Sequence, residues 1–149
     1  MLALTGCGGA VPPVTVQQML ANCDAYRGKP VQLAGYLGEC AGYECHLAAD
    51  KTRYDTWVET FNATRGLGKD DPKLSKLWPR IVALWPVGVG GDDAFDRKAA
   101  AFQKSYVVIV GSIAKDTCTG EGGTDRSPGI LPTDIRAWTQ SEGAPANTE

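Results

Sequence analysis

This 149-residue chain has no long apolar run, nearly equal numbers of positive and negative side chains, and only one histidine. Beyond the N-terminus no apolar run is longer than the five residues of Tyr106 to Val110, far short of the roughly 20 residues that span a bilayer as a helix. Its 15 Lys and Arg and 17 Asp and Glu give a formal net charge of −2, so no overall basic field attracts nucleic acid or anionic lipid. The composition therefore predicts one globular domain without a membrane-spanning helix.

The single histidine, His46, limits the catalytic arrangements that the chain can build. The sequence has no Gly-x-Ser-x-Gly motif, and the glycines at 66–69 lack the spacing of a phosphate-binding loop. Asp92, Asp93 and Asp96 follow two glycines and are typical of a first helical turn, where carboxylates interact favourably with the helix dipole. We therefore expect a protein that is not an enzyme and that holds no metal or cofactor.

Five cysteines carry more information than the histidine does. Cys40 and Cys45 flank four residues between two strand-like segments, which favours a disulfide across a hairpin. Cys23 and Cys118 would then form a second bond that closes most of the domain. The two other pairings of these four cysteines stay open at this point, but any of them predicts an oxidising compartment and leaves Cys7 over.

The segment Leu4-Thr5-Gly6-Cys7 resembles the lipobox of bacterial lipoproteins, which ends at the cysteine that is lipidated. The resemblance implies a signal peptide cut before Cys7, acylation of Cys7 with a fatty acid such as palmitate, and attachment to the cell envelope facing the periplasm. Glycine rather than aspartate follows the cysteine, which implies the outer membrane. Residues 8–13, rich in glycine and proline, are typical of a flexible tether.

Local sequence patterns divide the chain into 1–13 (signal-peptide remnant, lipobox and tether), a folded domain over 14–138 and a flexible tail over 139–149. Thr15 and Gln18 form a capping box that begins a short helix. Pro79 is expected to end a second helix that starts after Asp71. Helices are predicted over 16–23, 72–78 and 93–104, strands over 31–37, 45–49, 56–61, 106–114 and 130–138, and an extended segment over 80–87. The strand at 106–114 is apolar on both faces and should be internal, whereas Pro132 places the last strand at an edge.

A second resemblance concerns the fold. The segment from Tyr26-Arg27-Gly28-Lys29-Pro30-Val31 into Leu33-Ala34-Gly35-Tyr36 resembles small bacterial proteins with an oligonucleotide/oligosaccharide-binding (OB) barrel. This resemblance implies a mainly β protein with short helices: an OB-fold-like five-stranded antiparallel barrel with an N-terminal helix and a helical insertion over about 62–104. Gly35 would bend the first strand, with Gly111 as its later counterpart.

Together these features predict a lipid-anchored, non-catalytic binding or envelope-maintenance module. Its partners are the membrane and an envelope protein, peptide or saccharide. Residues 26–61 hold four Lys and Arg against five Asp and Glu, so nucleic acid is not expected. The candidate stacking residues are Tyr36, Tyr43, Tyr54 and Trp57. The repeated Leu-Trp-Pro at 77–79 and 84–86 is expected to serve the core or to line a binding surface.

The alternative function is a periplasmic redox, metal or haem protein. Cys40-x4-Cys45-His46 matches a variant of the c-type haem attachment signature, and Cys118 could supply a further zinc ligand.

Overall fold

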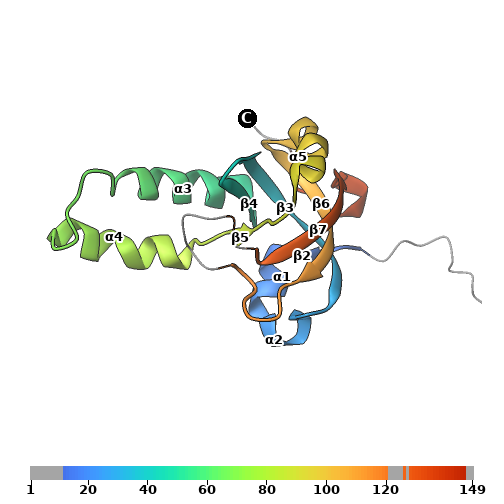
Figure 1. Ribbon diagram of the computed structural model, residues 1–149, viewed down its shortest axis with the longest axis horizontal. Coiled ribbons are helices and arrows are strands. Elements are labelled where there is room, and N and C mark those ends of the chain that lie inside the picture. Colours follow the sequence, from blue (N-terminus) through green and yellow to red (C-terminus); the bar gives the residue numbers. More distant parts are fainter. Residues whose placement is uncertain (1–11, 121–125, 127, 147–149) are drawn as a thin grey trace, which may run out of the picture.

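A six-stranded, mainly antiparallel sheet with short helices around it forms the body of the protein (Figure 1). The computed structural model describes residues 12–120, 126 and 128–146. The strand order is β5-β4-β3-β6-β7, and β2 pairs in parallel with residues 33–34 of β3, on the edge opposite β6. The strands are β2 (Val14–Thr15), β3 (Pro30–Ala41), β4 (Glu44–Ala48), β5 (Val87–Gly88), β6 (Ser105–Ile113) and β7 (Ile130–Ala137).

Five α-helices connect and cover these strands within the described residues. They are α1 (Val16–Ala21), α2 (Cys23–Tyr26), α3 (Lys51–Asn62), α4 (Pro72–Ala83) and α5 (Asp93–Ala99), the last extended by a 3₁₀ turn at Ala100–Phe102. The predicted capping box is present: Thr15 Oγ1 accepts from the amide of Gln18, and the Gln18 side chain accepts from the amide of Thr15. In Figure 1, α1 and α2 lie at one end of the sheet and α5 at the other.

Strand β3 is the centre of the sheet because it pairs along both of its edges. Residues 30–37 pair with β6, and residues 36–41 pair with β4 on the opposite edge. A Cβ at Gly35 would lie 2.5 Å from the carbonyl oxygen of Ala48 and 2.9 Å from a side-chain carbon of Val16. Glycine at this position therefore allows β4 and α1 to approach β3 closely.

The closed five-stranded barrel expected from the sequence is not formed. The sheet has six strands and is not closed into a barrel by a continuous strand pairing. A single isolated parallel bridge joins Val89, just after β5, to Ile130 at the start of β7. Strand β6 is internal and β7 is an edge strand, as their sequences predicted. The ladder between β6 and β7 shifts its register at Gly111, where a Cβ would collide with the carbonyl oxygen of Leu131.

One continuous core fills the inner side of the sheet. Met19 from α1 and Ala99 from α5 are fully buried in it beside the strand residues Leu33 and Ile109. The buried members of this cluster are Val16, Met19, Val31, Leu33, Leu37, Cys40, Cys45, Leu47, Val87, Val89, Phe95, Ala99, Val107, Ile109, Ile113, Cys118, Ile130 and Ile135. Both half-cystines of the short hairpin thus belong to the core.

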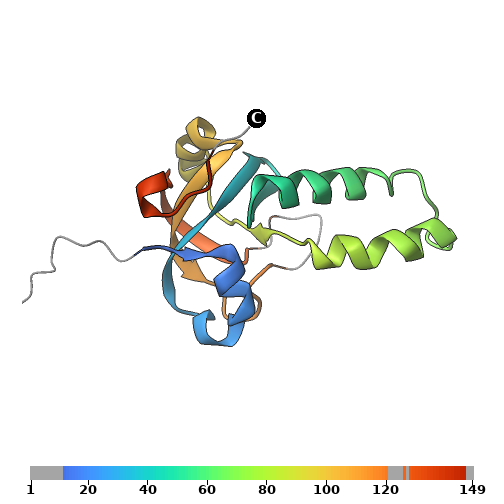
Figure 2. The same ribbon diagram turned by 180° about the vertical axis from the view of Figure 1, so that it is seen from behind.

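Residues 51–83 form a helical hairpin, α3 followed by α4, which projects away from the sheet (Figures 1 and 2). The predicted strand over 56–61 is wrong: Asp50 accepts from the amide of Arg53 and begins a helix, so 56–61 lies inside α3. Pro79 does not end α4, which continues to Ala83. Fully buried Ile81 gives the reason, because packing of the apolar face compensates for the amide that proline lacks. The extended segment predicted over 80–87 is also wrong for residues 80–83, which belong to α4. Of that segment only Val87 lies in a strand, β5.

The segment predicted as a flexible tail contains a 3₁₀ turn at Gln140–Glu142. Thr139 caps this turn, and Arg136 in β7 donates to Glu142 Oε1 at 2.7 Å. The ion pair holds the turn against the last strand, a contact that the local sequence pattern did not reveal. Residues 147–149 lie outside the described part.

The close approach at Gly35 generates a stability prediction. Gly35→Ala should lower the free energy of unfolding by about 1 to 3 kcal/mol, because the new methyl group meets backbone and core atoms that cannot move aside. The matched control is Gly68→Ala, since a Cβ there meets nothing within 4 Å. Urea denaturation of both variants measures the difference, and equal stability would contradict the proposed constraint.

Candidate functional site

Two disulfides join four of the five cysteines. Cys23 pairs with Cys118 and Cys40 pairs with Cys45, with Cα–Cα distances of 5.9 Å and 4.0 Å. The pairing that the sequence favoured is therefore the one present. In a loop-entropy description the 95-residue separation of the first bond stabilises the fold by about 4.7 kcal/mol, and the five-residue separation of the second by about 2 kcal/mol. Cys7 lies outside the described residues.

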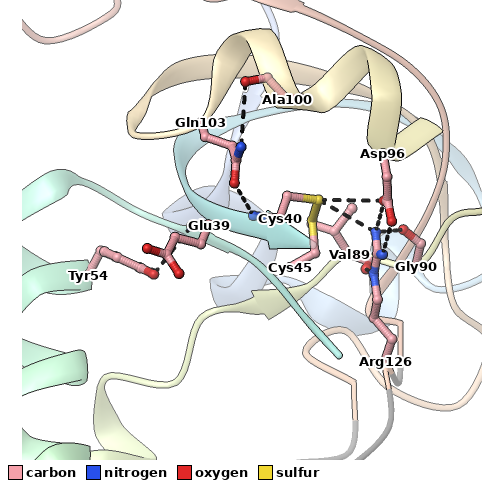
Figure 3. The surroundings of a disulfide bond; sticks show 10 residues. All are labelled: Glu39, Cys40, Cys45, Tyr54, Val89, Gly90, Asp96, Ala100, Gln103 and Arg126. Carbon is pink, nitrogen blue, oxygen red and sulfur yellow. Dashed lines mark hydrogen bonds and ion pairs between the residues drawn. A yellow bond between two sulfur atoms is a disulfide. The ribbon is translucent and has the colours of Figure 1, made fainter. Parts of the chain in front are cut away.

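Arg126 connects the Cys40–Cys45 hairpin to its surroundings (Figure 3). Its guanidinium donates to both carboxylate oxygens of Asp96 at 2.6 Å and to the carbonyl oxygens of Val89 and Gly90 at 3.1 and 3.0 Å. One of its nitrogens lies 3.5 Å from Cys40 Sγ. The side chains of Arg126 and Asp96 are only 14% and 21% exposed, so this is a largely desolvated ion pair.

Sequence reasoning missed this pair. It interpreted Asp96 only as one of three acidic residues at a helix start, a role that Asp92 fills by accepting from the amide of Phe95. No local pattern identifies Arg126 as the partner, because the two residues are 30 positions apart and meet only when α5 folds against the loop before β7.

Removing the carboxylate of Asp96 should destabilise the fold. Asp96→Asn leaves the Arg126 guanidinium without its charged acceptor in a largely desolvated place, which should cost about 1.5 to 3 kcal/mol. Asp93→Asn is the matched control, since Asp93 also lies in the first turn of α5 but is exposed. Chemical denaturation of the two variants should show a clearly larger loss for Asp96→Asn, and the same small change in both would show that the helix dipole is the only role of Asp96.

His46 lies in β4, half-buried, with its ring centroid 5.0 Å from that of Trp57. Burial, and secondarily the positive charge of Arg126, lowers the pKa of His46 from 6.5 to about 4. The imidazole is therefore neutral at pH 7. In the described part of the chain no three His, Cys, Asp or Glu side chains are grouped to hold a metal ion. The arrangement places an uncharged imidazole, tilted against the ring of Trp57, next in sequence to a buried half-cystine.

The depressed pKa of His46 makes the stability of the fold depend on pH. The unfolded chain binds this proton at pH 6.5 and the folded chain only near pH 4, so acidification through this window favours unfolding. We expect the free energy of unfolding to fall by about 2 kcal/mol between pH 7 and pH 5. His46→Gln should remove most of that slope in denaturation curves recorded at both pH values. An unchanged slope in the variant would assign the effect to other groups.

The four predicted stacking residues do not share one surface. Tyr36 and Trp57 are buried and Tyr54 half-buried, and their rings form a chain, with Tyr54 5.7 Å from Tyr36 and 6.2 Å from Trp57. Tyr43 stands apart in the turn between β3 and β4, where it is 75% exposed. Trp57 Nε1 is buried without a hydrogen-bond partner among the described residues. Tyr36, Tyr54 and Trp57 therefore attach α3 to the sheet.

The aromatic chain continues from the sheet into the helical hairpin. The ring centroid of Trp85 lies 5.7 Å from that of Trp57 and 6.3 Å from that of Trp78. The ring centroid of Phe61 lies 5.7 Å from that of Trp57. Trp85 is half-buried, while Phe61 and Trp78 are exposed. The repeated Leu-Trp-Pro motif is the sequence signal for this extension, since its two tryptophans, Trp78 in α4 and Trp85 just after the helix, contact each other. Apolar and stacking contact is the chemistry that this surface offers.

Comparison of the chain with known protein families, with curated proteins and with solved structures found no match. Among the helices described, none has the length and apolar character needed to cross a membrane.

Proposed function

We propose that this chain is a cell-envelope protein, anchored by an acyl group on Cys7 and facing the periplasm, whose folded domain is a non-catalytic binding module. The observation that carries this proposal is the cysteine pairing. Cys23, Cys40, Cys45 and Cys118 bond to one another, so the only cysteine left is the one that ends the lipobox-like segment Leu4 to Cys7. Disulfides persist in oxidising compartments, which supports export.

The strand arrangement supports a relationship to the OB barrel as part of this proposal. A long bent strand, β3, pairs with β4 on one edge and β6 on the other, and a parallel bridge between Val89 and Ile130 spans the opening. OB folds are partly open five-stranded barrels that bind ligands on one sheet face and the loops beside it. In such a barrel Tyr43 would lie in the first of these loops, where its exposed ring can reach a peptide or saccharide.

A redox or metal function for Cys40, Cys45 and His46 has less support. Both sulfurs are bonded and both cysteines are buried, so a thiolate from another protein has no direct access to the bond. The low pKa of His46 keeps its nitrogens neutral, but the bonded sulfurs offer no thiolate ligand beside it.

Acylation of Cys7 is the direct test. The full chain, with the n-region and h-region of a known lipoprotein placed before Leu4, should incorporate an alkyne-labelled palmitate and partition into detergent. Cys7→Ser in the same context should abolish the label, because the acceptor sulfur is gone. Cleavage at another position with no label on Cys7 would contradict the proposal.

Thiol titration of the same Cys7→Ser protein separates the alternative function. Protein isolated from the periplasm and denatured without reductant should show no reactive thiol, because the remaining four cysteines are bonded. Four reactive thiols would contradict the disulfides and would favour the metal-binding alternative.

A further inference from the structure

The helical hairpin carries half of the large apolar side chains that are exposed in the described part of the chain. Phe61, Trp78 and Val82 are 39%, 48% and 54% exposed, whereas the other three, Leu20, Tyr43 and Leu131, are scattered over the body. Trp78 and Val82 are four residues apart and therefore lie on the same side of α4. Ring contacts run from Trp78 to Phe61 on α3 through half-buried Trp85 and buried Trp57, and so connect the two helices. A grouped apolar surface of this kind marks an interaction site.

The same segment concentrates positive charge. Residues 62–85 contain five Lys and Arg and two Asp, a net charge of +3, while the rest of the chain holds ten against fifteen, or −5. The five cations are Arg65, Lys69, Lys73, Lys76 and Arg80. All five are exposed, and none forms an ion pair with a described residue. This charge is therefore available to an external anionic partner.

The distribution of these residues on α4 identifies the partner. By helical spacing, Lys73, Lys76 and Arg80 lie on the opposite side of the helix from Val82, and Leu74 and Ile81 lie between them toward α3. Helices with Lys and Arg on one face and Trp and Leu on the other lie in the interface of anionic bilayers. Trp keeps its ring at the headgroup level, and cations within about a Debye length of the phosphates add electrostatic attraction.

We propose that the hairpin α3–α4 is a membrane-docking element: Phe61, Trp78 and Val82 enter the interface of an anionic phospholipid surface, and the five cations of residues 62–85 attract that surface through their longer-range field. Its projection from the sheet lets it contact a plane before the body does (Figures 1 and 2). The net charge of −5 on the rest of the chain is repelled by the same surface and orients the hairpin toward it.

Together with the acyl group on Cys7, this site gives two points of attachment, a step that rests on the proposed function. The hairpin and β2, through which the N-terminal segment enters, lie on opposite sides of the sheet in both views (Figures 1 and 2). The affinity of the hairpin itself does not depend on the acyl group.

The test uses the full chain with Cys7→Ser, so that failure of the acyl anchor cannot affect the result. Vesicles of phosphatidylglycerol and phosphatidylcholine in equal parts should sediment with the protein and shift its tryptophan emission to the blue. Vesicles of phosphatidylcholine alone should bind at least tenfold more weakly, and raised salt should weaken binding to the anionic vesicles.

Variants distinguish binding through this surface from nonspecific adsorption of the protein to vesicles. Lys73→Glu combined with Lys76→Glu and Arg80→Glu, and separately Trp78→Ser, should each weaken binding about tenfold or more. Val82→Ser is the second apolar variant, because its exposed side chain is not needed for folding. Leu131→Ser removes an equally exposed apolar side chain on β7 and should change binding less than about twofold.

Several results would overturn the proposal. They are no sedimentation with the anionic vesicles at low salt, equal binding to neutral vesicles, and full binding by the charge-reversed variant while circular dichroism shows an intact fold. Binding to single-stranded DNA as strong as that to the vesicles, and unaffected by Trp78→Ser, would assign the charge to a polyanion instead.

Discussion

The rest of the fold depends on one constraint, the close approach of β4 and α1 to β3 at Gly35. A side chain at this position would push β4 and α1 away from β3, which pairs with β6 along residues 30–37 and with β4 along residues 36–41. Because β3 does both, α1, α5 and all the longer strands contribute to a single core. The two disulfides and the Arg126–Asp96 pair then secure the ends of elements that the strand pairing has already brought together.

Much of this architecture could be predicted from local chemistry. The capping box at Thr15, the internal strand β6 and the edge strand β7 each follow from short patterns whose physical meaning does not depend on distant residues. The cysteine pairing also followed, since two cysteines that flank a tight hairpin meet whatever the rest of the chain does.

The failures share a cause, which is tertiary packing. Residues 56–61 read as a strand because threonine and aromatic residues favour strands, but the Asp50 cap and burial of Trp57 against the sheet select a helix. Pro79 predicts a helix end, but α4 continues past this proline because Ile81 is fully buried against the rest of the fold. The Arg126 site was missed for the same reason, because its partners come from three separate elements.

The pairing of β2 determines how the protein responds to tension on its N-terminus. Val14 and Thr15 run parallel to Leu33 and Ala34, so a pull on the N-terminal segment loads their hydrogen bonds in shear. If those bonds rupture, α1 unwinds next, but extension ends at Cys23, because its covalent bond to Cys118 transfers the load to the loop after β6. Extension from this end is therefore limited to the first two dozen residues before the load reaches Cys118, and the strands β3, β4, β5 and β6, which lie inside the loop that the bond closes, are bypassed.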